Sequence, residues 1–181
     1  MNRICLLEDV ESYMWDRPDS ALQIVTSIDE SDLTTKELKA KRDLFKWYLV
    51  MKATNETPEA SLLLSAYDSF TSKGPSSERF LSYLFKGIDY MLSKDYESAM
   101  KELVKAEEDS EYASTYLLGI LHSYKAVIHK GYYDYLATIS ENILAAEKFF
   151  EAGSMRQYMI MIEDISDCYI MNNDIENASK Y

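Results

Sequence analysis

The chain has 181 residues and a formal charge of −12, which comes from 31 acidic and 19 basic side chains. At 47% hydrophobic and 13% aromatic residues, it is too apolar to be intrinsically disordered. Five Gly and three Pro are too few for a loop-rich β-sandwich or a glycine-rich phosphate-binding scaffold. The charge also argues against a nucleic-acid interface in this segment, because such a surface concentrates Lys and Arg. The composition therefore predicts an acidic, mainly helical protein.

Helical periodicity runs along the chain, and no segment alternates between apolar and polar residues as a half-buried strand does. Pro18 and Pro58 each suit the first turn of a helix, where a missing N–H costs nothing. Ser72–Ser77 is the clearest loop. We expect nine or ten helices. The third is capped by Thr34 or Thr35 and includes Leu49, and the last is a stub that begins at Asp174. The others are expected over Asp9–Trp15, Pro18–Ile28, Pro58–Phe70, Phe80–Leu92, Tyr96–Glu108, Tyr112–Ile128, Tyr132–Phe150 and Met155–Met171.

Large and small residues follow one another in a fixed order between Tyr83 and Ala106. Small residues suit the points where two helices of a hairpin cross closely, and tyrosines fill the space around the turn. The pattern resembles the tetratricopeptide repeat (TPR), a helical hairpin that stacks on its neighbours. The resemblance implies an all-α stack of antiparallel hairpins, with seven repeat-packing positions at Tyr83, Gly87, Tyr90, Tyr96, Ala99, Leu103 and Ala106.

Weaker copies of the pattern flank this repeat. Ala178, preceded by Tyr169, and Ala21 lie at nearly equal distances along the chain on either side of Ala99, two repeats away in each direction. The average period is near 39 residues, compared with about 34 in the TPR family. We therefore expect one TPR-like domain over residues 1–181, built from five hairpins of which the last is incomplete: 3–30, 34–72, 78–109, 111–152 and 154–181.

The segment Pro18–Leu22, with the sequence PDSAL, carries a second resemblance. It is similar to the start of the TPR regions of Bacteroidetes membrane-anchored regulators, where a signal sequence or lipobox cysteine precedes a PDSAL hairpin. In that group a membrane helix and a coiled-coil or DNA-binding output follow the TPR array. The resemblance implies a periplasmic or membrane-anchored parent protein.

The ends of the chain fit a fragment of such a parent. Residues Met1–Leu7 lack the apolar stretch of about 7–15 residues that a signal peptide contains. No segment approaches the roughly 18 apolar residues that span a bilayer. Cys5 has two interpretations, a lipid-attachment cysteine or an ordinary residue of the first helix. Asn173–Tyr181 has the pattern of a turn and the start of a helix.

A search for catalytic and metal-binding groups yields no site. His122 and His129 are seven residues apart, about 10 Å along a helix, which is too far to chelate one metal. Cys168 fits a small core position. Glu163 and Asp167 are four residues apart and could bind a cation together. In a chain with 31 acidic residues such pairs arise by chance, so a solvated surface is the favoured interpretation. We therefore expect no catalytic residue, cofactor or metal, and a protein that is not an enzyme.

Two surfaces are candidates for binding a protein or peptide partner. The first is a basic stripe in the third helix, and the second is an apolar strip of the best repeat. Either has a plain structural interpretation, a solvated face for the stripe and hairpin core for the strip. The leading hypothesis is a non-catalytic, TPR-like scaffold module that binds a protein or peptide. The alternative is the sensory domain of a membrane-anchored signalling or transcriptional regulator that recognises a small molecule. The partner-binding residues are expected to be Lys39, Arg42, Lys46, Leu84, Ile88, Met91 and Tyr116.

Overall fold

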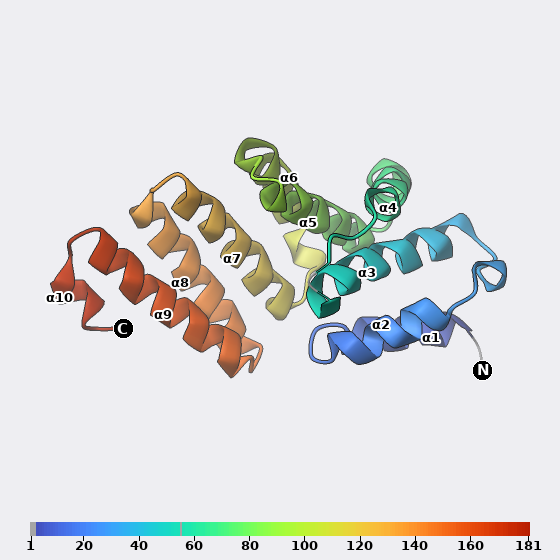
Figure 1. Cartoon of the computed structure of the whole chain (residues 1–181), viewed down its shortest axis with the longest axis horizontal. Coiled ribbons are helices and arrows are strands. Elements are labelled where there is room, and N and C mark those ends of the chain that lie inside the picture. The colour runs from blue at the N-terminus through green and yellow to red at the C-terminus, as the bar shows by residue number, and fades with distance from the viewer. Residues whose placement is uncertain (1–2, 55) are drawn as a thin grey trace. The chain divides into compact units, whose positions relative to one another are not determined.

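The computed structural model describes residues 3–54 and 56–181 of the chain, and their side chains from residue 6 onward. These residues form ten α-helices and two short 3₁₀ helices, with no strand among them, so the all-α prediction is confirmed (Figure 1). Within this part of the chain, no helix has both the length and the hydrophobicity to cross a bilayer. The chain divides into two compact units, residues 1–85 and 86–181, which are described separately.

The first unit is built around a long central helix. Its helices are α1 (Arg3–Tyr13), α2 (Pro18–Ser27), α3 (Lys36–Thr54), α4 (Ala60–Lys73) and the first half of α5 (Ser76–Leu92). The Tyr48 ring of α3 stacks on Phe85 of α5, with centroids 4.7 Å apart. Lys41 Nζ lies 2.7 Å from a Glu11 oxygen and 3.1 Å from one of Glu78. One lysine of α3 therefore joins α1 to α5.

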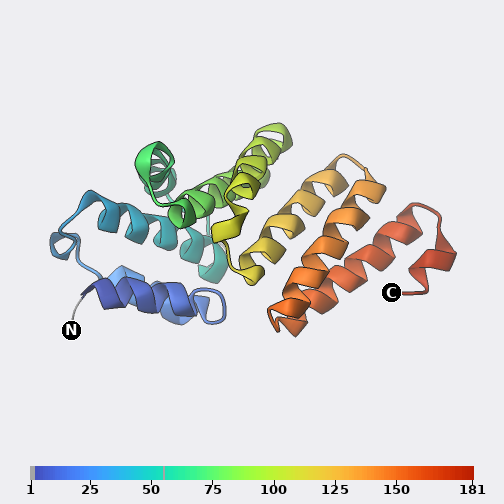
Figure 2. The same ribbon diagram turned by 180° about the vertical axis from the view of Figure 1, so that it is seen from behind.

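The second unit is a row of antiparallel helices. It contains the end of α5, then α6 (Tyr96–Glu108), α7 (Thr115–Gly131), α8 (Tyr135–Glu151), α9 (Met155–Met171) and the short α10 (Ile175–Ala178). Each of these helices packs against the next along the chain from α6 onward. Figures 1 and 2 show α7, α8 and α9 side by side from opposite directions. Their layout places a wide surface of α8 against two neighbours.

The same turn joins the two helices of each hairpin in this unit. Lys94, Tyr133 and Asn173 all have φ near +60°, at 61°, 60° and 59°. Such a left-handed residue is strained for any side chain except Gly, and it lets the chain reverse sharply. An aspartate follows each one, and its carboxylate accepts a hydrogen bond from the backbone N–H three residues later, at 3.1 Å in all three turns. The three turns are almost evenly spaced along the chain, at the repeat period expected from the sequence.

Small buried residues recur with the same spacing as the turns. Ala99, Thr138 and Ala178 lie at equivalent points of α6, α8 and α10, and all three are buried. A Cβ added at Gly87 would lie 2.6 Å from a Leu103 side-chain carbon, so α5 and α6 cross closely there. The expected repeat period therefore has a structural counterpart in the second unit.

The other residues predicted for repeat packing are placed as follows. Leu103 and Ala106 are buried in α6, and Ala21 is buried in α2. The ring of Tyr83 meets Tyr67 edge-on at 5.8 Å, and Tyr169 stacks on Tyr181 at the same distance. The Lys86 ammonium lies over the Tyr90 ring, 4.5 Å from its centroid, and the Tyr96 ring contacts Tyr132.

Several helix boundaries differ from those expected. The loop Ser72–Ser77 shrinks to two residues, because α4 continues to Lys73 and α5 begins at Ser76. Tyr112 lies in a 3₁₀ helix instead of α7, since Ser114 caps α7 by accepting a hydrogen bond from the Leu117 N–H. Tyr132 precedes α8, because the left-handed residue Tyr133 interrupts the helical backbone there. α4 likewise begins at Ala60 and not at Pro58.

Asp134→Ala tests the shared turn. The substitution removes the carboxylate that caps α8, so we expect the free energy of unfolding to fall by about 1 kcal/mol. Asp134→Asn keeps an oxygen that accepts the same hydrogen bond and is expected to stay close to wild type. Urea denaturation followed by circular dichroism measures both variants. An equal loss in the two would mean that the hydrogen bond is not what stabilises the turn.

Candidate functional site

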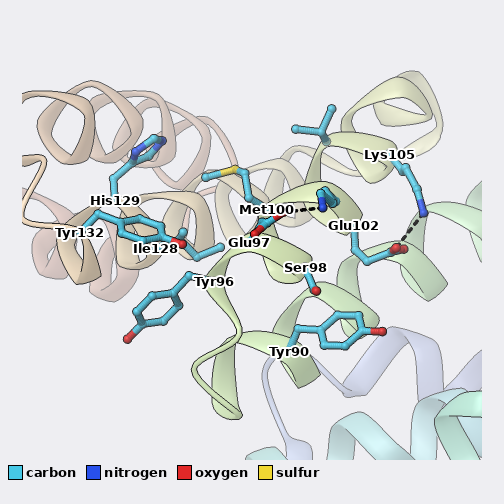
Figure 3. A pocket seen from close by; sticks show the side chains of 12 residues that line it. Tyr90, Tyr96, Glu97, Ser98, Met100, Glu102, Lys105, Ile128, His129 and Tyr132 are labelled. Atoms are coloured by element: carbon cyan, nitrogen blue, oxygen red, sulfur yellow. Dashed lines mark hydrogen bonds and ion pairs between the residues drawn. The ribbon is translucent and has the colours of Figure 1, made fainter.

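A surface groove of about 690 Å³ runs between α6 and α7. We call it the α6–α7 groove. Its apolar lining includes Met100 and Val104 of α6 and Ile128 of α7, with Tyr90 contributed by α5. Figure 3 shows Tyr96 next to Tyr132, with His129 beyond Tyr132, and Tyr90 near Ser98. The groove is therefore an apolar channel with aromatic side chains along its length.

An aromatic pair lies where α6 begins and α7 ends. Tyr96 and Tyr132 meet edge-to-face, with centroids 5.6 Å apart and planes at 72°. A Cβ added at Gly131 would lie 2.5 Å from the Tyr96 ring, so the ring rests directly on the glycine backbone. Glycine at this position therefore lets the aromatic ring close in on α7.

Charged side chains flank the groove in pairs that satisfy each other. Lys101 Nζ lies 2.6 Å from Glu97, and Lys105 Nζ lies 2.7 Å from Glu102. The hydrogen bond to Glu97 raises the pKa of Lys101 above its usual value. Since each lysine has a carboxylate three or four residues away, the rim of the groove carries little net charge.

The helix α7 forms one wall and carries an unusual set of charges. Among the helices of the described segments, it is the one without Asp or Glu, although the chain holds 31 of them. Its Lys125 is only 8% exposed. Lys125 Nζ lies 2.9 Å from Glu141 of α8 and 3.3 Å from Glu107 of α6. His122 Nδ1 lies 2.7 Å from the other Glu141 oxygen.

The pKa values of this cluster reflect a balance between burial and pairing. Burial raises the pKa of Glu141, but the hydrogen bonds from His122 and Lys125 outweigh it, so the pKa falls below its usual value. Burial lowers the pKa of Lys125, yet the bonds to Glu141 and Glu107 bring it above its usual value. Both groups are therefore held in their charged forms across the neutral range.

A second polar cluster ties α7 to α9. Lys130 of α7 pairs with Asp164 of α9, and the buried Asn142 of α8 donates its amide N–H to the same carboxylate. The bond to Asp164 raises the pKa of Lys130, more than burial lowers it. The three helices α6, α8 and α9 thus each supply a carboxylate to a lysine of α7.

The basic stripe of α3 is largely neutralised by nearby carboxylates. Arg42 bonds to the adjacent Asp43 through both Nε and a terminal nitrogen, at 2.9 and 2.6 Å. Lys39 pairs with the exposed Glu30 at 3.2 Å. Lys46 is half-buried on the same helix. This pairing favours the plain interpretation of the stripe, a solvated face of α3.

The predicted apolar strip is mostly inside the protein. Leu84 and Ile88 of α5 have no exposed surface, so they are unavailable to a partner and belong to the core. Met91 remains partly exposed at the end of α5. Tyr116 of α7 packs edge-on against Phe149 at 5.5 Å, and its hydroxyl accepts a bond from Gln157. Neither Tyr116 nor the three residues of the strip line the α6–α7 groove.

The other residues considered from sequence lie apart from one another. His122 joins the Glu141 cluster and His129 lines the groove, while Cys168 is fully buried in α9. Glu163 and Asp167 lie on the exposed surface of α9. Within the described segments, no group of three His, Cys, Asp or Glu side chains could hold a metal ion. The side chain of Cys5 falls outside the described residues.

Sequence reasoning missed the groove. Met100 and Val104 stand four residues apart on α6, and neither is one of the repeat-packing positions. That spacing was a usable signal, because two apolar residues one turn apart on the outer side of a helix mark an apolar stripe. Tyr132 gave no signal, since its ring reaches the groove only because the chain leaves α7 at Gly131.

Comparison of the chain with protein-family models, with curated proteins and with solved structures finds no match. The site therefore has to be interpreted from its own residues.

Two substitutions test the Lys125 cluster. Lys125→Met leaves Glu141 with one partner, so we expect the free energy of unfolding at pH 7 to fall by about 2 kcal/mol. This is less than the roughly 3–5 kcal/mol of a fully buried pair, because solvent still reaches Glu107. Lys101→Met, in the exposed pair with Glu97, is the matched control and should cause no measurable change. Equal losses in both lysine variants would contradict the assignment of the cluster.

The pH dependence of stability gives a separate check on Glu141. A carboxyl group whose folded pKa is lowered stabilises the fold above its unfolded pKa, about 4.3, and stops doing so as the pH falls through the folded value. The difference in unfolding free energy between wild type and Glu141→Gln should therefore shrink as the pH falls below about 5. Urea titrations between pH 3 and 8 measure it. A difference that grows on acidification would contradict the lowered pKa.

Proposed function

We propose that this chain is a non-catalytic binding module for a protein or peptide, and that an apolar segment of the partner enters the α6–α7 groove. The observation that carries the proposal is the lining of the groove, where Met100, Val104 and aromatic side chains are open to solvent. A monomeric protein rarely leaves a continuous apolar channel uncovered. Covering one such side chain fully contributes about 1.5–3 kcal/mol.

The rim supports a partner that binds mainly through apolar side chains. The pairs Glu97–Lys101 and Glu102–Lys105 already satisfy each other, so the groove offers few free polar groups. The adaptable Met100 and the flat faces of Tyr96 and Tyr132 suit anchors of varied shape. The charged groups nearest the groove are engaged in ion pairs, so a partner in the groove would gain its affinity mainly from apolar contact.

The TPR-like architecture belongs to the same proposal. Its support is the common turn at Lys94, Tyr133 and Asn173 and the matching recurrence of small buried residues. Stacked hairpins of this kind leave a groove wherever one hairpin meets the next, and the groove lies where α6, from one hairpin, meets α7, from the next. In this proposal the five hairpins over residues 1–181 form one repeat domain.

A second candidate function is the sensory one, recognition of a small molecule. The groove volume of about 690 Å³ falls within the roughly 300–1,000 Å³ of small-molecule sites, and three tyrosines line it. A small ligand would perturb only the residues around Tyr96, Tyr132 and His129. A peptide would perturb the length of α6 as far as Lys105, and NMR titration separates these two outcomes.

Val104→Glu tests the groove, with Val127→Glu as its control. The two valines are 44% and 45% exposed, but only Val104 lines the groove. Peptides selected from a random phage-displayed library against the wild-type chain serve as probes. We expect Val104→Glu to weaken them at least tenfold, about 1.4 kcal/mol, and Val127→Glu to leave affinity within twofold. Isothermal titration calorimetry measures both.

The result that contradicts the proposal is equally definite. Selected peptides that bind both valine variants as tightly as wild type would place the binding surface elsewhere. A circular dichroism spectrum of each variant confirms that the helices are intact before binding is measured.

A further inference from the structure

Tyr133, in the turn between α7 and α8, is the most exposed large hydrophobic side chain of the described residues. It is 78% exposed, and its side chain makes no hydrogen bond, ion pair or ring contact with another residue of the described segments. The neighbouring Tyr132 is also exposed, but its ring contacts Tyr96 and lines the α6–α7 groove. The Tyr133 ring therefore contributes little to the stability of the fold.

The backbone at Tyr133 makes a tyrosine unfavourable there. One exposed aromatic residue is ordinary by itself, but its φ of 60° is left-handed, a conformation that Gly and Asn adopt most easily. The equivalent turn before α10 has Asn173 at this point, with a φ of 59°. The turn itself thus accepts Asn and does not require an aromatic residue. A strained residue without internal contacts points to a role outside the fold.

Tyr133 follows directly on the last residue that lines the groove. Its Cα lies about 3.8 Å from that of Tyr132, as for any two consecutive residues. Figure 3 shows Tyr132 and His129 together at one end of the lining, away from Lys105. A bound segment advances by about 3.3–3.6 Å per residue when extended, so one or two residues carry it past Tyr132.

The charged groups beside Tyr133 are already engaged within the protein. The Asp134 carboxylate accepts a hydrogen bond from the Ala137 N–H at 3.1 Å, which caps α8. Lys130 pairs with Asp164 of α9. What the turn offers to a partner is therefore mainly the apolar face of the Tyr133 ring, which favours an uncharged side chain.

Other parts of the same chain are poor occupants of this site. The α7–α8 hairpin already has a neighbouring helix on each side, α6 next to α7 and α9 next to α8. No further hairpin is needed to cover it. A second copy of the chain is opposed by the net charge of −12, because the two copies repel each other. A segment of a different protein fits the turn better.

We propose that Tyr133 is a specificity-determining residue of the α6–α7 groove. The partner segment that fills the groove continues past Tyr132 and packs one uncharged apolar side chain on the Tyr133 ring. This role rests on the proposed function, and it adds the end at which the partner leaves the groove and the kind of residue that it carries there. The ring is presented to the partner at the expense of a strained turn.

The test uses the full chain and peptides of about 12 residues, selected against it from a random phage-displayed library. Extended, such a peptide reaches about 40 Å, whereas α6 is about 20 Å long. A selected peptide can therefore fill the groove and still pass Tyr132. Isothermal titration calorimetry measures its affinity, and urea denaturation measures the stability of each variant.

Tyr133→Asn should change stability and binding in opposite directions. Relief of the left-handed strain should raise the midpoint of urea denaturation by about 0.3 M, whereas loss of the ring should weaken the peptides about fivefold. Tyr133→Phe should keep both values, because the hydroxyl makes no bond within the described residues. Asn173→Tyr, the reciprocal change at the equivalent turn, should lower the midpoint and leave the affinity within twofold.

A double-mutant cycle locates the contact on the peptide. Alanine scanning of a selected peptide identifies the anchor beyond the groove, and Tyr133→Asn should weaken the peptide no further once that anchor is Ala. Independent losses from the two changes would place the anchor elsewhere and overturn the inference.

Three further outcomes would also overturn it. Peptides that are weakened by Val104→Glu but bind Tyr133→Asn as tightly as wild type would refute the role of Tyr133 and leave the proposed function standing. Equal weakening by Tyr133→Asn and Asn173→Tyr would assign the effect to the structure of the turns. Self-association of the wild-type chain that Tyr133→Asn abolishes would assign the ring to a second copy. Peptides that Val104→Glu does not weaken would contradict the proposed function itself.

Discussion

The second unit depends on the positive charge that α7 carries among acidic neighbours. The chain has a net charge of −12, but α7 carries Lys125 and Lys130 and no carboxylate. Its neighbours α6 and α8 each provide a carboxylate that pairs with Lys125, and α9 provides one that pairs with Lys130. Burial opposes these charges, but the pairing outweighs it, so Glu141, Lys125 and Lys130 stay charged next to the packed helices. Removing one lysine would leave a carboxylate poorly solvated on a neighbouring helix. α7 thus fixes where the other three can lie.

The same cluster sets one side of the α6–α7 groove. Lys125 lies one turn before Ile128 and His129, and its partner Glu107 lies three residues after Val104. The ion pair therefore joins α6 to α7 close to the apolar lining, while the Tyr96–Tyr132 contact joins them at the other end. A groove that stays open needs such contacts, since apolar walls would otherwise close on each other.

The sequence predicted the local features of this protein better than its surfaces. Gly87, Ala99 and Tyr96 belong to a short-range pattern, so the helices and the repeat period could be inferred from it, whereas the shared left-handed turns were seen only in the structure. Burial depends on which helix covers which, and periodicity alone does not show it. Leu84 and Ile88 have the spacing of an exposed strip but lie in the core. The sequence likewise suggests that Arg42 is available to a partner, whereas in the structure it bonds to Asp43. Val104 and Val127 are a clear case, since the two valines are equally exposed and only Val104 lines the groove.

An acidic protein with an exposed apolar groove has to avoid associating with itself. Net charge opposes that association, because copies of a −12 chain repel each other at long range. The groove is nearly neutral at its rim, because Lys101 and Lys105 pair with Glu97 and Glu102. In the proposed function, a partner in the groove is therefore selected by shape and apolar fit. Repulsion between copies and selection of a partner then depend on different features, the charge of the whole chain and the apolar lining of the groove.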